Sequence, residues 1–277
     1  MFNKIVKSVI TIFVVTLIFD LSYGLKLPGG LGSKKSKKAA KTAIAYNLVA
    51  PEYDKDLAMY GVIGSFDLGI AGAPVCQKVM QCQINLALSN KGAHKALDYL
   101  TDALANKDTK AKIVALQKEL KKEKKVEKKQ VKMKEIQDLQ MATFDGVDEK
   151  KELSKEQAEL LTKASFVTAG TWYFLATAGK DAAELPALIK EGIDEVKDAI
   201  DDAKSGGLSG MKAVAGLTGN LKGIKAAAGL PKQFIESGKL QSTIFKKIGK
   251  MLKNNKYESP SLEDASKSDK AFNPSED

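Results

Sequence analysis

Apolar residues recur along most of the chain at the three- and four-residue spacing of amphipathic helices. The clearest run is Ile189, Ile193, Val196 and Ile200, which forms an apolar stripe on a segment whose other side is acidic. No convincing strand pattern appears, and no Asn-Gly turn joins two alternating segments. The pattern predicts an all-α fold, an elongated helical bundle with one long Lys/Glu-rich helix and several shorter apolar helices.

Proline and capping residues set the expected boundaries of the shorter helices. Pro74, Pro186 and Pro231 can each serve as the first helical residue. Ser154 and Gln157 have the spacing of a capping box, so a helix is expected to begin there. The other expected helices cover residues 74–90, 94–104, 186–204, 211–228 and 231–253.

The long helix is predicted over residues 108–144. Thirteen of the eighteen residues from 118 to 135 are charged, nine Lys and four Glu, and none is Gly or Pro. Lys, Glu, Gln and Leu all propagate helix well, so about ten turns are expected. Its apolar stripe continues as an acidic stripe of Glu119, Glu123 and Glu127. Two interpretations stay open: a solvated helix that bridges two packed ends, or a Glu stripe that meets lysines of a partner helix or chain.

Both ends of the chain are predicted to lie outside the folded domain. Residues 1–24 combine two lysines, an apolar stretch of twelve residues (8–19) and small residues at 22 and 24, as in a cleaved Sec-type signal peptide. Residues 25–44 resemble a flexible polybasic arm, which either aids solubility or contacts anionic lipid. Residues 254–277 are predicted to be a disordered acidic tail, which leaves 45–253 as one bundle domain. The expected location is the periplasm or the exterior of a bacterium.

Charge composition narrows the classes of partner. The formal net charge is +10, and all 44 basic residues are Lys. Arginine supplies the bidentate fork that proteins use on phosphates and base edges, so a chain without it is a poor nucleic-acid binder. Diffuse attraction to anionic surfaces remains.

No motif indicates an enzyme, a metal site or a cofactor. The single histidine, His94, has no second ligand at metal-binding spacing. Cys76 and Cys82 are six residues apart, and on a continuous helix their Cα atoms would be about 9 Å apart. A disulfide needs roughly 4.4–6.8 Å. We therefore expect either a bridged turn with a helix break, which is the favoured prediction for an exported protein, or a reduced pair.

The most apolar part beyond the signal peptide is residues 164–179, which carry no charge. A buried core helix is the default, because sixteen residues are short for a membrane span. The alternatives are a pocket for an apolar ligand near Trp172, or a segment that inserts into a bilayer. The residues concerned are Phe166, Trp172, Tyr173, Phe174 and Leu175.

The segment 231–253 is basic and amphipathic. Phe245 and Ile248 lie on its apolar side. Its flank carries Lys239, Lys246, Lys247 and Lys250. Such a helix can lie in a lipid interface, or it can pack its apolar side on the bundle with the lysines in water.

Together these features predict a non-enzymatic exported helical protein that binds at the bacterial envelope. Its partner would be an anionic membrane surface or an envelope protein, and homo-oligomerisation stays open. The alternatives are a carrier that encloses an apolar ligand between helices near Trp172, and a membrane-inserting effector.

Overall fold

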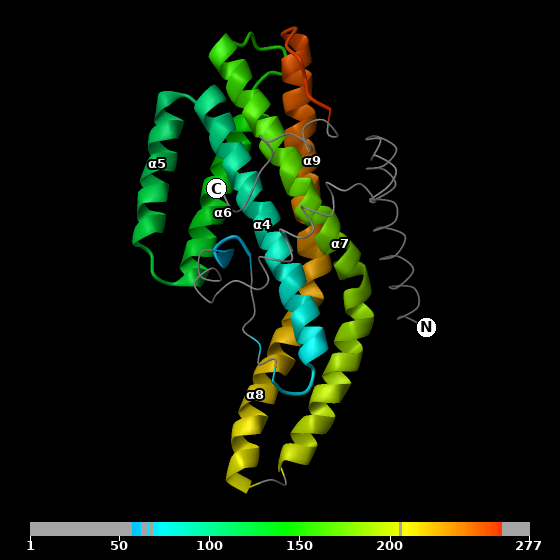
Figure 1. Ribbon diagram of the computed structural model, residues 1–277. Coiled ribbons are helices and arrows are strands. Elements are labelled where there is room, and N and C mark those ends of the chain that lie inside the picture. The colour runs from blue at the N-terminus through cyan, green and yellow to red at the C-terminus, as the bar shows by residue number, and fades with distance from the viewer. Residues whose placement is uncertain (1–56, 62–65, 67–68, 205–206, 262–277) are drawn as a thin grey trace. The chain divides into compact units, whose positions relative to one another are not determined.

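The computed structural model describes residues 57–61, 66, 69–204 and 207–261. In these residues the chain forms six α-helices and no strand, which confirms the predicted all-α helical bundle (Figure 1). The helices are α4 (Ala73–Leu104), α5 (Lys107–Lys122), α6 (Val126–Asp145), α7 (Lys155–Lys204), α8 (Gly207–Ala226) and α9 (Leu230–Asn254), with a 3₁₀ turn at Ala227–Gly229. The predicted signal peptide, the polybasic arm and residues 262–277 of the predicted tail lie outside the described residues.

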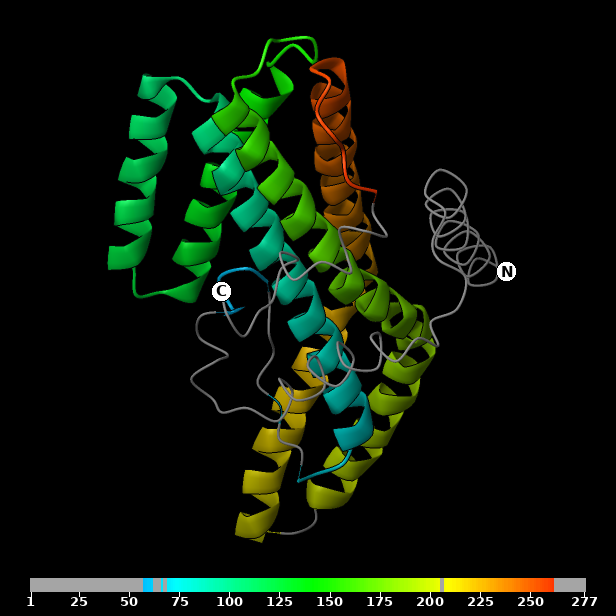
Figure 2. The ribbon, with the colours of Figure 1, turned by 45° about the horizontal axis from the view of Figure 1, so that its top comes forward.

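Three long helices, α4, α7 and α9, lie side by side and form the centre of the bundle (Figures 1 and 2). Their facing side chains include Leu97 of α4, Leu161 of α7 and Ile248 of α9, all fully buried. The second half of α7 also packs against α8 and the first turns of α4, around a second apolar cluster that contains Leu185 and Ile224. Burial of this kind, rather than helix propensity, stabilises most helices in globular proteins.

Local signals placed three helix starts correctly, and the first is Pro74, which lies in the first turn of α4. The Ser154 N–H donates to Gln157 Oε1 at 3.0 Å and the Gln157 N–H donates to Ser154 Oγ at 3.2 Å, so the capping box is formed and α7 follows it. Pro231 lies in the first turn of α9. Pro186 was a wrong boundary, because it lies inside α7, which is continuous over 50 residues. Buried Leu185 and Ile189 on either side of the proline keep the same face packed, which offsets the missing backbone hydrogen bond.

The predicted single helix over 108–144 is wrong in one respect. The chain leaves the helix at Glu123, whose φ of −74° and ψ of 134° are extended, and folds back as α6. The Glu123 carboxylate accepts hydrogen bonds from the N–H groups of Lys124 at 2.9 Å and Lys125 at 3.0 Å, which stabilises the turn. A straight helix would leave its apolar residues in water, whereas the hairpin buries Ile113 of α5 and Ile136 of α6.

The predicted disulfide is also wrong. α4 runs through Cys76 and Cys82 without a break, and both cysteines are buried with no disulfide between them. Burial, and then the nearby charge of Glu195, raises the pKa of the Cys76 thiol to about 11. Val75, Val79 and both cysteines pack in one apolar cluster, which favours a continuous helix. Helical geometry keeps residues six apart beyond bonding distance. The predicted helices at 74–90 and 94–104 are therefore one helix.

Candidate binding surfaces

The predicted membrane-contact residues of α9 fall into two groups. Ile248 is fully buried, and Phe245, 9% exposed, packs against Ala169 and Phe166 of α7. α7 and α4 thus cover the apolar side of α9. Lys239 and Lys246 are exposed to solvent. Contact of Phe245 or Ile248 with lipid stays a prediction, and it would require α9 to leave the bundle.

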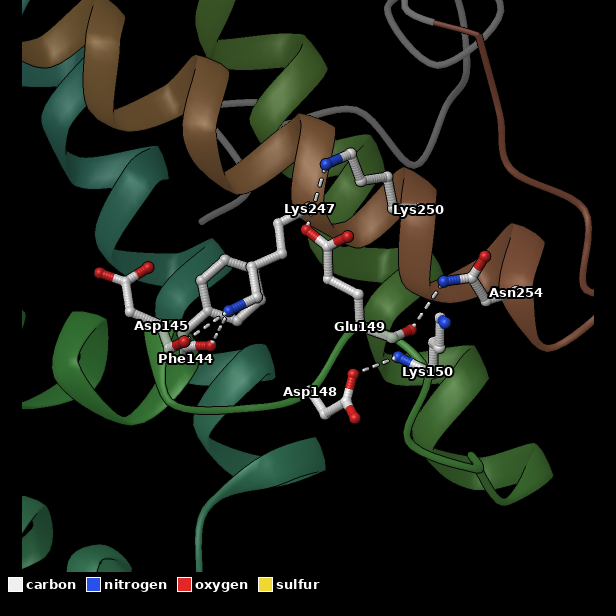
Figure 3. Close-up of polar contacts among 8 residues, drawn as sticks. All are labelled: Phe144, Asp145, Asp148, Glu149, Lys150, Lys247, Lys250 and Asn254. Atoms are coloured by element: carbon white, nitrogen blue, oxygen red, sulfur yellow. Dashed lines mark hydrogen bonds and ion pairs between the residues drawn. The ribbon is translucent and has the colours of Figure 1, made fainter.

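The other two lysines, Lys247 and Lys250, bind the end of α6 and the loop that leads to α7 (Figure 3). Lys247 Nζ donates to the carbonyl oxygens of Phe144 and Asp145 at 2.5 and 2.9 Å, and it lies 4.9 Å from the centroid of the Phe144 ring. These carbonyls end α6, so the ammonium satisfies acceptors that the helix leaves open. Lys250 forms an ion pair with Glu149 at 3.3 Å.

Most of the described side chains of residues 164–179 lie in the packed core. Trp172, Phe174 and Leu175 are all buried, Phe166 is partly buried, and the Tyr173 side chain lies outside the described residues. The segment also carries polar contacts. In particular, Thr171 Oγ1 donates to Gln241 Oε1 of α9 at 2.7 Å. The segment thus lies under α4 and α9 as an internal helix, which is the default expected from its length.

The side-chain amide of Gln241 joins the three central helices, α4, α7 and α9. Gln241 Nε2 donates to Ser89 Oγ of α4 at 2.6 Å and to Ser237 Oγ at 3.2 Å. Ser237 Oγ in turn donates to Asn90 Oδ1 at 2.7 Å. A satisfied buried network of this kind fixes how the helices align along one another.

Among the helices in the described part of the chain, none has both the length and the apolarity needed to cross a bilayer.

A cleft of about 580 Å³ opens between α4 and the α5–α6 hairpin, and we call it the hairpin cleft. Each helix contributes a stripe at helical spacing. The stripes are Lys91, His94, Lys95 and Asp98 on α4, Gln117, Leu120 and Lys121 on α5, and Lys129, Met133 and Ile136 on α6. Met59 and Tyr60 also line the cleft. The cleft does not reach Trp172, around which the ligand pocket was predicted.

The segment 57–61 is fastened to both walls of the hairpin cleft. Gln130 Nε2 of α6 donates to the carbonyl oxygens of Ala58 at 2.6 Å and Gly61 at 3.1 Å. Asn90 Nδ2 of α4 donates to the Tyr60 carbonyl at 2.9 Å. These three bonds fix Met59 and Tyr60 at the cleft without any need for a ligand.

The two ends of the hairpin cleft differ in charge. At one end Asp98 accepts hydrogen bonds from Gln140 Nε2 at 2.7 Å and Gln117 Nε2 at 3.4 Å. Although Asp98 is open to the cleft, desolvation by the surrounding helices raises its pKa, against the effect of the Gln140 bond. The other end carries Lys91, Lys121 and Lys129. These lysines lie one to three helical turns from the level of Asp98, on the side of the turn that joins α5 to α6. They share that side because α5 runs antiparallel to α4 and α6 (Figure 1).

His94 lies between these ends, and it is neutral at pH 7. Burial lowers its pKa from 6.5 to about 4. Its ring packs at a tilt of 54° on Tyr60, with 5.6 Å between centroids. His94 therefore adds no charge to the cleft wall.

The turn of the hairpin carries a second charged surface, the hairpin tip, which we define as residues 118–132. This stretch contains eight Lys and three Glu. Of its apolar residues, Val131 is 67% exposed. One Glu of the predicted acidic stripe, Glu119, forms an ion pair with Lys132 across the hairpin.

Sequence reasoning missed both hairpin features, since a straight helix has neither a tip nor a cleft. The available signal was the point at which the apolar stripe of the predicted long helix becomes acidic. Beyond that point the same face of the helix can no longer pack against an apolar core.

Comparison with known proteins found no family model, no curated protein and no solved structure that matches this chain. Within the described residues, no group of three or more His, Cys, Asp or Glu is arranged to hold a metal ion.

Proposed function

We propose that this protein is an exported, non-catalytic binding protein that docks on an anionic lipid surface of the bacterial envelope through the hairpin tip. The observation that carries the proposal is an excess of positive charge at the hairpin tip. The turn and the adjoining ends of α5 and α6 contain eight lysines and three glutamates. A lysine close to an anionic membrane contributes about 1 kcal/mol of attraction. The export component rests on the signal-peptide pattern of residues 1–24.

The hairpin tip is a better candidate than α9 for this contact. The apolar side of α9 is inside the bundle, and Lys247 and Lys250 already hold the α6–α7 connection. At the tip, by contrast, Val131 is exposed among lysines, so shallow apolar contact can add to the charge attraction. Docking there requires no rearrangement of the core.

Charge reversal at the tip tests the proposal. The variant combines Lys124→Glu, Lys125→Glu and Lys128→Glu. These positions precede or begin α6, where negative charge is favourable to the helix dipole, so the fold should be retained. We expect the variant to lose at least about tenfold in affinity for phosphatidylglycerol vesicles in co-sedimentation at low salt.

The matched control reverses three exposed lysines of α9, namely Lys239→Glu, Lys246→Glu and Lys253→Glu. It changes the net charge equally, so a smaller loss in this control locates the contact at the tip. Equal losses would show that only overall charge matters. A wild-type protein that ignores anionic vesicles would leave an envelope protein as the partner.

A further inference from the structure

We propose that the hairpin cleft is a binding site for a free single-chain amphipathic anion, a medium-chain carboxylate. The head group would lie among Lys91, Lys121 and Lys129, and the chain would lie over Leu120 and Met133. This site concerns a small soluble ligand, so it does not depend on the proposed membrane docking.

The size of the cleft suits a small molecule. Its volume of about 580 Å³ lies within the range of roughly 300–1,000 Å³ that is usual for ligand sites. The side chains of Leu120, Met133 and Ile136 supply an apolar wall drawn from both arms of the hairpin. Such a wall can bury an alkyl chain, and each buried methylene is worth about 0.8 kcal/mol.

The arrangement of charge indicates a negative head group. The described lining contains four lysines, and they come from three helices that are separate in the sequence. Among the described residues of the lining, Asp98 is the only carboxylate. It stands at the other end and accepts hydrogen bonds from Gln117 and Gln140. A ligand whose carboxylate lies at the lysine end would therefore be attracted by the lysines and would stay away from the negative charge of Asp98.

The cleft is also held in shape before any ligand arrives. Gln130 and Asn90 fix the segment 57–61 to α6 and α4, and Gln140 joins α6 to Asp98 of α4. A site that is ordered in advance loses less conformational entropy on binding. The neutral ring of His94 adds a flat uncharged wall beside the chain position.

Calorimetry on the full chain, without vesicles, tests the proposal with three probes. Decanoate carries both head and chain, 1-decanol lacks the charge, and acetate lacks the chain. We expect decanoate to bind, 1-decanol to bind at least about tenfold more weakly, and acetate to give no detectable heat. Equal binding of decanoate and 1-decanol, or no binding of decanoate, would overturn the assignment.

Two matched variants locate the site. Lys121→Gln with Lys129→Gln should weaken decanoate binding at least about tenfold. Lys118→Gln with Lys134→Gln removes the same charge from the same two helices outside the cleft lining and should leave binding unchanged. Leu120→Trp, which fills the cleft from a half-buried position, should abolish binding while the helical circular-dichroism signal persists. Equal effects of the two lysine pairs would overturn the assignment.

The two proposals can fail separately. The tip variant at Lys124, Lys125 and Lys128 leaves the cleft lining intact, so it should bind decanoate normally even where it has lost vesicle binding. Loss of decanoate binding in that variant would mean that the lysines of the cleft are not the site.

Discussion

The bundle of α4, α7 and α9 and the α5–α6 hairpin are both helical, but different forces stabilise them. In the bundle, side chains such as Leu161 and Ile248 are removed entirely from water. In α5, Ile113 alone is buried, and the helix packs chiefly on α6. The hairpin relies on strong helix formers and on one apolar seam, to which exposed charge pairs such as Glu119 with Lys132 add little.

The difference shows where binding chemistry can reside. A helix that is buried on most sides has few groups left to offer a partner, whereas the hairpin presents its lysines to solvent and to the cleft. Elements with little burial also open at lower free energy than the core. We therefore expect the hairpin to combine low local stability with most of the binding capacity of the described chain.

A pair of leucine truncations provides the largest contrast. Leu161→Ala in α7 should reduce the free energy of unfolding by about 3–4 kcal/mol, because it leaves a cavity in a fully buried site. Leu116→Ala in α5 removes a half-buried side chain and should cost only about 1 kcal/mol. Urea unfolding followed by circular dichroism measures both. Similar costs would mean that the hairpin is as tightly packed as the bundle.

The boundary between the two regions should be sensitive to acid through His94. Its pKa is about 4 in the folded protein and 6.5 in the reference state, so between these values the unfolded chain binds a proton that the folded chain does not. Stability therefore falls as the pH drops through this window, by about 2 kcal/mol from pH 7 to pH 5.

The variant His94→Gln isolates that contribution. Asp98, whose raised pKa acts in the opposite direction, is present in both proteins and cancels in the comparison. The stability of the wild type relative to the variant should decrease toward pH 5 in urea titrations. Parallel pH curves for the two proteins would contradict the assignment of a neutral buried imidazole.

The smallest expected difference in stability is between variants of Lys247 and Lys132, which both form charge contacts. Lys247→Met removes two hydrogen bonds to the end of α6 and should cost about 1 kcal/mol. Lys132→Met removes the exposed pair with Glu119 and should leave the melting temperature unchanged. Differential scanning calorimetry measures both. A larger effect at Lys132 would show that the ion pair, rather than the apolar seam, holds the hairpin closed.

Much of the fold followed from local sequence signals. The helical class followed from apolar spacing, and the start of α7 followed from Ser154 and Gln157. The break at Glu123 was not visible locally, because residues 118–135 are all compatible with helix. The continuity of α7 through Pro186 was hidden for the opposite reason, since a local breaker was overruled by packing on both sides.

The candidate sites divide in the same way. Composition indicated lysine-mediated attraction to anions, but it placed the contact on α9, whose residues Phe245 and Ile248 prove to be buried. The lysines of the cleft could not be grouped in advance, because Lys91, Lys121 and Lys129 lie on three helices and share a surface only after α5 folds back on α6.

By itself, the sequence determined which segments are helical and that their exposed faces are rich in lysine, because both properties depend on neighbours within one or two turns. Tertiary structure alone decided that the charged segment is a hairpin, that Cys76 and Cys82 lie apart on one helix, and that a cleft exists. Each of these depends on burying apolar side chains against segments that are distant in the sequence, and no local pattern encodes that free energy.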